Sequence, residues 1–186
     1  MKLTSTTMNP TPTVPIKLRL RELTQLFNSM DPSPFHDRDL DADAEEFILS
    51  WARELPPAEE IELVLHLTTP PPPERAKAVA GAVQHYFAQR AELKDREYRL
   101  RWRRGRISLF VGLLFLAGCL LIGELLVELG QGALAAVLKE SLTIGGWVAM
   151  WRPLDFLLYD WWPLRAELRL VQRLARMRVR LELPAV

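Results

Sequence analysis

The sequence contains a single cysteine, Cys119, which excludes a disulfide within the chain and any metal site built from several cysteines. Histidine is almost as scarce, because only His36, His66 and His85 are present and no two of them have the spacing of metal ligands. The chain also lacks a G-x-S-x-G motif, a P-loop and a glycine-rich dinucleotide turn. We therefore expect no catalytic residue, no metal and no cofactor.

One acidic stretch, DRDLDADAEE, invites a calcium interpretation because Asp37, Asp39, Asp41 and Asp43 alternate. A calcium-binding loop starting at Asp37 needs glycine at its sixth position and glutamate at its twelfth, where this sequence has Ala42 and Ile48. Acids at a helix N-terminus explain the run better, with Asp39 or Asp41 as the N-cap. A weaker hypothesis makes His36 a general base beside Asp37 and Asp39, and it requires a cleft over this loop.

Charge is distributed unevenly along the chain, although the formal net charge is only +1. Residues 1–60 contain eleven acidic and six basic residues, whereas residues 94–106 contain seven basic and two acidic ones. Residues 107–123 contain no charged residue. The basic stretch lies next to an apolar run, so we interpret it as a membrane-topology signal and expect no nucleic-acid binding.

The N-terminal part predicts a small α+β domain. Residues 1–14 contain no apolar run typical of a signal peptide and are expected to be a disordered leader. Alternating apolar residues predict strands in PIKLRLREL and EEIELVLHLTT. Between them, DADAEEFILSWARELPP predicts a helix that buries Phe47, Ile48, Trp51 and Leu55. A long helix follows the four prolines at 70–73, and its acid–base pairs after residue 90 indicate a solvated stalk.

The stalk leads into a predicted transmembrane span at residues 107–129, since a hydrocarbon core of about 30 Å needs about 20 helical residues. For the return span two registers compete. Residues 142–159 would place Arg152 and Pro153 near the bilayer centre, whereas residues 133–151 place Arg152 at the interface. We favour residues 133–151. The predicted interface anchors are Trp102, Arg103, Arg104, Arg106, Trp147, Trp151, Arg152, Trp161 and Trp162.

Residues 153–163 then form a predicted interfacial helix, broken at Pro153 and Pro163. Residues 164–186 contain six arginines and two glutamates, and they predict a cytoplasmic helix followed by a third strand. The predicted fold is an α+β membrane protein. A three-stranded cytoplasmic domain at 15–105 is completed by residues 164–186 from the other end of the chain, and a transmembrane hairpin at 106–152 lies between these two parts.

Two residue sets within the predicted hairpin are candidates for interactions. Small residues on one face of the first span form a predicted helix-packing face, namely Ser108, Gly112, Cys119 and Gly123. The charged residues near the far side of the membrane are Glu124, Glu128, Lys139 and Glu140. A Glu124–Lys139 bridge that joins the two spans is the simpler interpretation of this cluster, and a proton or ion path through Glu124 and Glu140 is the alternative.

Two segments, MDPSPFHDRDLDADAEEFILSWARELP and GWVAMWRPLDFLLYDWWP, resemble the signature regions of an uncharacterised family of small bacterial inner-membrane proteins. The resemblance covers about residues 16–183. It implies a bacterial origin and two spans, and it implies no activity.

These observations predict a non-enzymatic accessory, scaffold or assembly protein of the bacterial inner membrane, with both termini in the cytoplasm. Its expected partners are the lipid bilayer and either a larger membrane protein complex or further copies of itself. The alternative is a homo-oligomeric ion or proton conductor that uses the intramembrane carboxylates.

Overall fold

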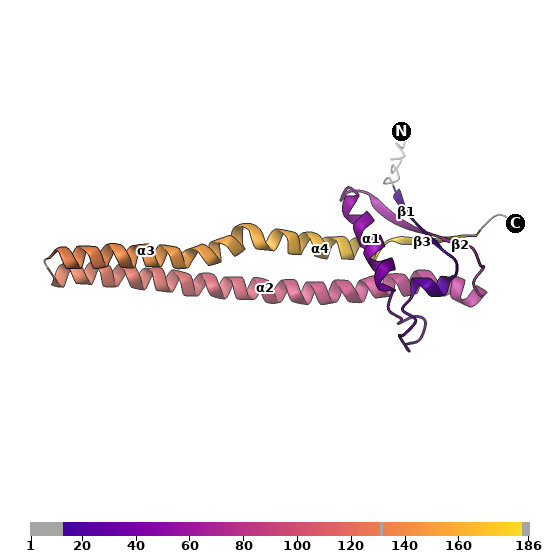
Figure 1. Cartoon of the computed structure of the whole chain (residues 1–186), viewed down its shortest axis with the longest axis horizontal. Coiled ribbons are helices and arrows are strands. Elements are labelled where there is room, and N and C mark those ends of the chain that lie inside the picture. The colour runs from indigo at the N-terminus through magenta and orange to yellow at the C-terminus, as the bar shows by residue number, and fades with distance from the viewer. Residues whose placement is uncertain (1–12, 131, 184–186) are drawn as a thin grey trace, which may run out of the picture. The chain divides into compact units, whose positions relative to one another are not determined.

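The computed structural model describes residues 13–130 and 132–183. The described chain forms β1 (Thr13–Leu20), the 3₁₀ helix η1 (Leu23–Leu26), α1 (Ala42–Glu54), β2 (Glu60–Leu67), α2 (Pro73–Leu129), α3 (Ala133–Asp155), the π-helical turn η2 (Phe156–Asp160), α4 (Trp161–Leu174) and β3 (Arg178–Glu182) (Figure 1). The chain divides into two compact units. The domain unit comprises Met1–Leu93 and Leu168–Val186, and the hairpin unit comprises Lys94–Glu167.

The three predicted strands form one sheet in the order β1-β2-β3, and both pairs are parallel. The third strand comes from the C-terminal part of the chain, as the sequence predicts. β1 begins at Thr13, two residues inside the predicted leader, and residues 1–12 of that leader lie outside the described residues. The fold is therefore of mixed helix and strand, with a parallel sheet and a long helix.

The connections of the sheet decide which of its faces is covered. Both crossovers advance in the same direction across the sheet, so right-handed connections place their helices on the same face. Inward side chains of β1 and β2 indeed join one apolar core with residues of α1, α2 and α4, including Ile16, Leu65, Ile48, Phe87 and Leu174. The opposite face of the sheet exposes alternate, mostly charged residues.

Helix α1 begins at the N-cap Asp41, whose carboxylate accepts a hydrogen bond from the Asp43 amide at 3.0 Å. Its buried residues are Ala44, Ile48 and Ala52. The prediction that Trp51 belongs to the buried stripe is wrong, because 49% of this side chain is exposed. The buried face is the one that carries Ala44, Ile48 and Ala52, and Trp51 lies beside it with its ring 6.0 Å from that of Phe47.

Two contacts within the domain unit hold the chain from the end of α4 to the start of β3. The guanidinium of Arg173 on α4 donates hydrogen bonds to the backbone oxygens of Pro56 and Glu59, at 2.9 and 2.8 Å, in the turn that precedes β2. The amide nitrogen of Gln84 on α2 donates to the backbone oxygen of Met177 at 2.9 Å. Both contacts position the chain for the start of β3.

Candidate functional site

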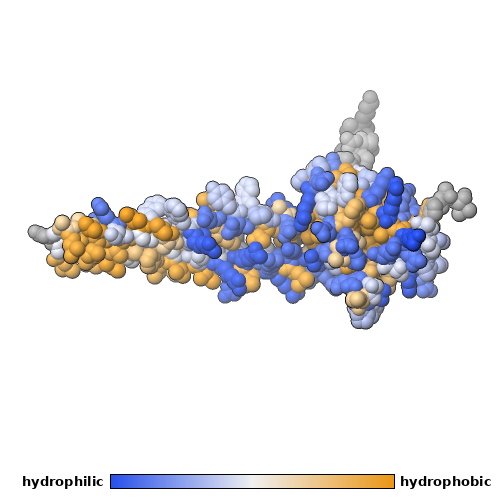
Figure 2. Space-filling view, in the orientation of Figure 1, coloured by the Kyte–Doolittle hydropathy of each residue, from blue (hydrophilic) through white to orange (hydrophobic). Residues whose placement is uncertain are grey.

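Two helices of the described chain are long and apolar enough to span a membrane. Their most apolar stretches, in α2 and in the continuous helix from Ala133 to Leu174, are only 17% and 11% buried. A core helix of a soluble protein would bury most of such a stretch. Figure 2 shows the resulting apolar surface over one part of the hairpin unit. The 23 residues of α3 extend over about 35 Å, enough to cross a bilayer core of about 30 Å.

The predicted packing face of α2 lies mainly against α3. A Cβ atom added at Gly112 would lie 3.0 Å from the sulfur of Met150 and 3.2 Å from Pro153, so only glycine allows this approach without adjustment. A Cβ at Gly123 would lie 3.1 Å from the side chain of Lys139. Cys119 is buried, whereas Ser108 is exposed. Three of the four predicted residues thus lie in the contact between the two helices.

The contact also contains two glycines that the sequence reasoning missed. A Cβ at Gly105 would overlap the ring of Phe156, and one at Gly146 would lie 2.8 Å from a methyl group of Leu116. Gly105, Gly112 and Cys119 are spaced seven residues apart, which is the signal that could have identified Gly105. No comparable signal distinguishes Gly146 from Gly145, which has no atom near its Cβ position.

The predicted charged cluster contains one ion pair that links the helices. The ammonium of Lys139 lies 2.8 Å from a carboxylate oxygen of Glu124. Gly123 is next to this pair and accommodates the stem of Lys139. Glu124, Glu128 and Glu140 are all exposed, and the ion pair across the two helices involves Glu124.

The predicted interface anchors fall into two groups. Trp102 and Trp161 are partly buried, with ring centroids 6.0 Å apart, and the guanidinium of Arg165 lies 5.8 Å from the Trp161 ring. The other anchors are exposed. These exposed anchors are Arg103, Arg104, Arg106, Trp147, Trp151, Arg152 and Trp162.

The predicted helix break at Pro153 is absent, since α3 passes through this proline. The Phe156 amide donates to the backbone oxygens of Arg152 and Pro153, and the chain then widens into the π-helical turn η2. A proline removes one backbone donor, and a π-helical turn absorbs such a defect without ending the helix. Pro163 likewise lies inside the continuous helix, three residues after the π-helical turn, and removes one more backbone donor without ending it.

The acidic loop of the domain unit is held by its own hydrogen bonds. Asp31 accepts from the Ser33 and Asp39 amides at 2.9 and 2.8 Å. Hydrogen bonds from the Ser33 side chain and from these amides lower the pKa of Asp31 to about 2. His36 is exposed and stacks edge-on against His85, while His85 lies 3.4 Å from a carboxylate oxygen of Asp37. Within the described residues, no group of three or more acidic, histidine or cysteine side chains has metal-binding geometry.

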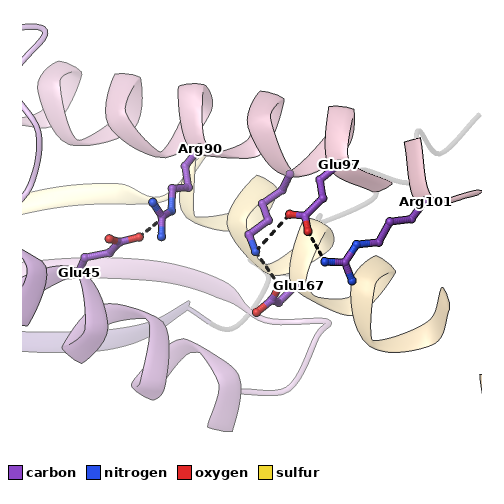
Figure 3. Close-up of polar contacts among 6 residues, drawn as sticks. Glu45, Arg90, Glu97, Arg101 and Glu167 are labelled. Carbon is purple, nitrogen blue, oxygen red and sulfur yellow. Dashed lines mark hydrogen bonds and ion pairs between the residues drawn. The ribbon is translucent and has the colours of Figure 1, made fainter. Parts of the chain in front are cut away.

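A second polar contact connects α1 and α2 within the domain unit. The guanidinium of Arg90 lies 2.8 Å from a carboxylate oxygen of Glu45 (Figure 3). Partial burial, followed by a hydrogen bond with Glu45 and its negative charge, raises the pKa of Tyr86, which stays protonated. Glu45 thus forms an ion pair with Arg90 and a hydrogen bond with Tyr86, and this arrangement suits a structural cross-link between helices.

A similar cross-link occurs at the start of the hairpin unit. The ammonium of Lys94 on α2 lies 3.0 Å from Glu167 on α4 and 3.8 Å from Glu97, and Glu97 in turn pairs with Arg101 (Figure 3). The stalk charges therefore bind one another and the neighbouring helix.

Comparison with known proteins found no matching family model, no similar curated protein and no similar solved structure.

Proposed function

We propose that this protein is a non-enzymatic accessory, scaffold or assembly protein of the bacterial inner membrane that docks on a larger membrane protein complex. In this proposal α2 and α3 cross the bilayer as a hairpin, and the domain unit lies in the cytoplasm together with both termini. The bacterial origin rests on the two signature-like segments of the sequence.

The observation that carries the proposal is the exposed apolar surface of the hairpin unit. Large apolar side chains are exposed along both helices, among them Phe110, Leu114, Leu121, Leu134, Ile144 and Val148. Water would strongly disfavour such a surface, at about 25 cal/mol per Å² of apolar area. One group of arginines precedes this apolar surface, before residue 107, and a second group follows it, after residue 164. The positive-inside rule supports a cytoplasmic location for both groups.

The outer face of the sheet supports a docking role for the domain unit. Parallel sheets are normally covered on both faces, yet Lys17, Arg19, Arg178 and Arg180 are exposed on this one. In the register of the sheet, Lys17 and Arg180 flank Val64, which is buried. The stems of these long side chains can cover the valine; Arg180 pairs with Glu182 at 3.9 Å, and the charge of the exposed Lys17 is offered to a partner.

The Glu124–Lys139 ion pair supports the scaffold over the conductor. A carboxylate that carries protons must exchange them, whereas Glu124 has a cationic partner at 2.8 Å. The pair joins α2 to α3 and is explained as a structural contact.

The proposal is tested by extracting the full chain from its native membranes in mild detergent, cross-linking it, and identifying what co-purifies. We expect one larger membrane complex at a fixed stoichiometry. Lys17→Glu, on the outer face of the sheet, should reduce this co-purification by about tenfold or more. Lys77→Glu makes the same charge change on an exposed residue of α2 and should leave it unchanged.

A homo-oligomer without any partner would contradict the docking proposal. Ion flux in vesicles that is lost in Glu124→Gln would then identify the protein as a conductor.

A further inference from the structure

An open cavity of about 570 Å³ lies in the hairpin unit between α2 and the segment that runs from α3 through η2 into α4. Its polar lining includes three arginines, which come from both sides of the cavity. The lining residues are Arg101, Arg104, Gly105, Ser108, Arg152, Phe156, Asp160, Pro163 and Leu164. The cavity therefore brings together cations that lie about fifty residues apart in the sequence.

The charge balance of the cavity favours an anion. Arg101, Arg104 and Arg152 face a single carboxylate of the lining, that of Asp160. Arg101 also pairs with Glu97, which leaves Arg104 and Arg152 as the principal cations. Guanidinium groups bind phosphate oxygens through paired hydrogen bonds, and two of them balance a singly charged phosphodiester together with the nearby acid.

The local backbone brings one wall of the cavity close to α2. Gly105 has no side chain, and the ring of Phe156 therefore packs where a Cβ atom would lie. The π-helical turn begins at this phenylalanine and widens the second helix opposite the arginines of α2. π-Helical turns of this kind occur frequently at functional sites.

The cavity lies at the boundary between the basic and the apolar parts of the hairpin unit. Arg104 and Ser108 line it, while Ile107 and Val111 on the following turns of α2 are exposed by 54% and 60%. On the second helix Arg152 lines it, and the preceding Trp151 is 66% exposed. An amphipathic ligand can thus place its phosphate among the arginines and its acyl chains along the apolar helices.

We propose that this cavity binds the phosphate headgroup of one anionic phospholipid, with Arg104 and Arg152 as the phosphate ligands and Ser108 as an additional hydrogen-bond donor. The inference rests on the proposed membrane insertion of the hairpin. Basic cavities between membrane helices on the cytoplasmic side are a recurring type of binding site for anionic lipid headgroups. The apolar surface next to the cavity favours a lipid over free phosphate.

Native mass spectrometry of the full-length chain in detergent tests this site. The chain is titrated with phosphatidylglycerol, with phosphatidylcholine and with inorganic phosphate. We expect one tightly bound phosphatidylglycerol per chain, and binding of phosphatidylcholine that is weaker by about tenfold or more. The double variant Arg104→Gln/Arg152→Gln should weaken phosphatidylglycerol binding by about tenfold or more, because it removes two charge-assisted contacts.

The matched control is Arg103→Gln/Arg106→Gln, which removes the same charge from neighbouring arginines that do not line the cavity. It should leave the tight binding unchanged. Ser108→Leu fills the cavity without changing its charge and should also abolish tight binding, whereas Ser141→Leu, on an exposed part of α3, should not. These variants keep the test valid if the double arginine variant fails to fold.

Equal losses in the two arginine pairs, or equal binding of the two lipids, would overturn the proposed site. Displacement of the lipid by millimolar inorganic phosphate would identify a free-phosphate site instead. Extraction of the chain by alkaline carbonate would overturn both this site and the membrane hairpin. If the chain stays in the membrane but lipid binding is unchanged in Arg104→Gln/Arg152→Gln and in Ser108→Leu, the lipid site alone is overturned.

Discussion

Asp31 shows how one side chain organises the loop that precedes α1. It bonds the amides of Ser33 and Asp39 and so closes an eight-residue segment without regular structure. These bonds favour the ionised carboxylate, and the pKa of Asp31 falls from 3.8 to about 2. A group with a lowered pKa contributes stability above its ordinary pKa and loses that contribution as the pH falls through the lowered value.

We therefore expect the stabilising effect of Asp31 to be fully present above about pH 5, to fall as the pH drops through both pKa values, and to disappear by about pH 1. A carboxyl carbon NMR titration of the full chain in detergent, with Asp31→Asn to assign the signal, measures the midpoint directly. The stability difference between wild type and Asp31→Asn should shrink over the same pH interval. A midpoint near 3.8 would show that the hydrogen bonds do not form.

The outcome at Trp51 illustrates which individual residues a sequence reveals. Apolar periodicity identified Ile48 as buried but also selected Trp51, because a large apolar side chain contributes most to such a pattern. Burial instead follows Ala44, Ile48 and Ala52. Alanine carries little hydropathic signal, and a close helix–sheet contact needs its small volume. The burial of a single residue was therefore predictable only where apolar periodicity and the side-chain size that the contact allows point to the same residue.

At the scale of the element, the contact between α2 and α3 depends on small residues at heptad spacing. Gly105, Gly112 and Cys119 repeat every seven residues, which keeps one face of α2 against its neighbour. The packing face was predictable from α2 only in part, because Gly112, Cys119 and Gly123 were identified, whereas Gly105 was missed and Ser108 is exposed. The counterpart of this face on α3, with Gly146 and Met150, was not predictable, because the rotation of α3 depends on contacts between the helices.

This contact predicts opposite behaviour for two adjacent glycines. Gly146→Leu places a side chain where Leu116 and Cys119 already lie, and it should destabilise the hairpin by about 1–3 kcal/mol. Gly145→Leu projects into open space and should have little effect. The reaction rate of the buried Cys119 with a membrane-permeant maleimide reports the change, and it should rise only in Gly146→Leu. Equal rates in both variants would contradict the packing.

The Glu124–Lys139 pair predicts a coupled effect of two substitutions. Glu124→Gln leaves the Lys139 ammonium without its carboxylate and should lower stability by about 1–2 kcal/mol. The exchange Glu124→Lys with Lys139→Glu restores opposite charges and should recover most of the loss. Thermal unfolding of the detergent-solubilised chain measures both effects. If the charge-exchanged double variant instead lost as much stability as the two single substitutions together, the pair would not be a stabilising contact.

At the scale of the whole molecule, the chain builds a parallel sheet whose second crossover contains the hairpin unit. β2 leads into α2, and the chain reaches β3 only after α3 and α4. The sequence allowed the prediction of three strands in one sheet, because each strand shows clear alternation. Their order and parallel direction were not predictable, since these depend on pairing between segments far apart in the sequence, such as Thr13 with Glu60 and Glu62 with Arg178.

The continuation of the helix through Pro153 was also not predictable from the sequence. Proline in an apolar helix usually indicates a break or a kink, and the prediction followed this rule. The π-helical turn after Pro153 compensates for the lost donor. Such a turn has no sequence signature, so the path between α3 and α4 became apparent only with the structure.

The central claim is that the hairpin crosses the inner membrane and leaves both termini in the cytoplasm. Single cysteines introduced into a Cys119→Ser background test it directly. Gly132→Cys lies between the two apolar helices, where a Cβ atom meets no neighbour, and Ser50→Cys lies on the exposed side of α1. We expect a membrane-impermeant maleimide to label position 132 in intact cells and position 50 only after permeabilisation. Labelling of position 50 in intact cells, or of position 132 only after permeabilisation, would contradict the account.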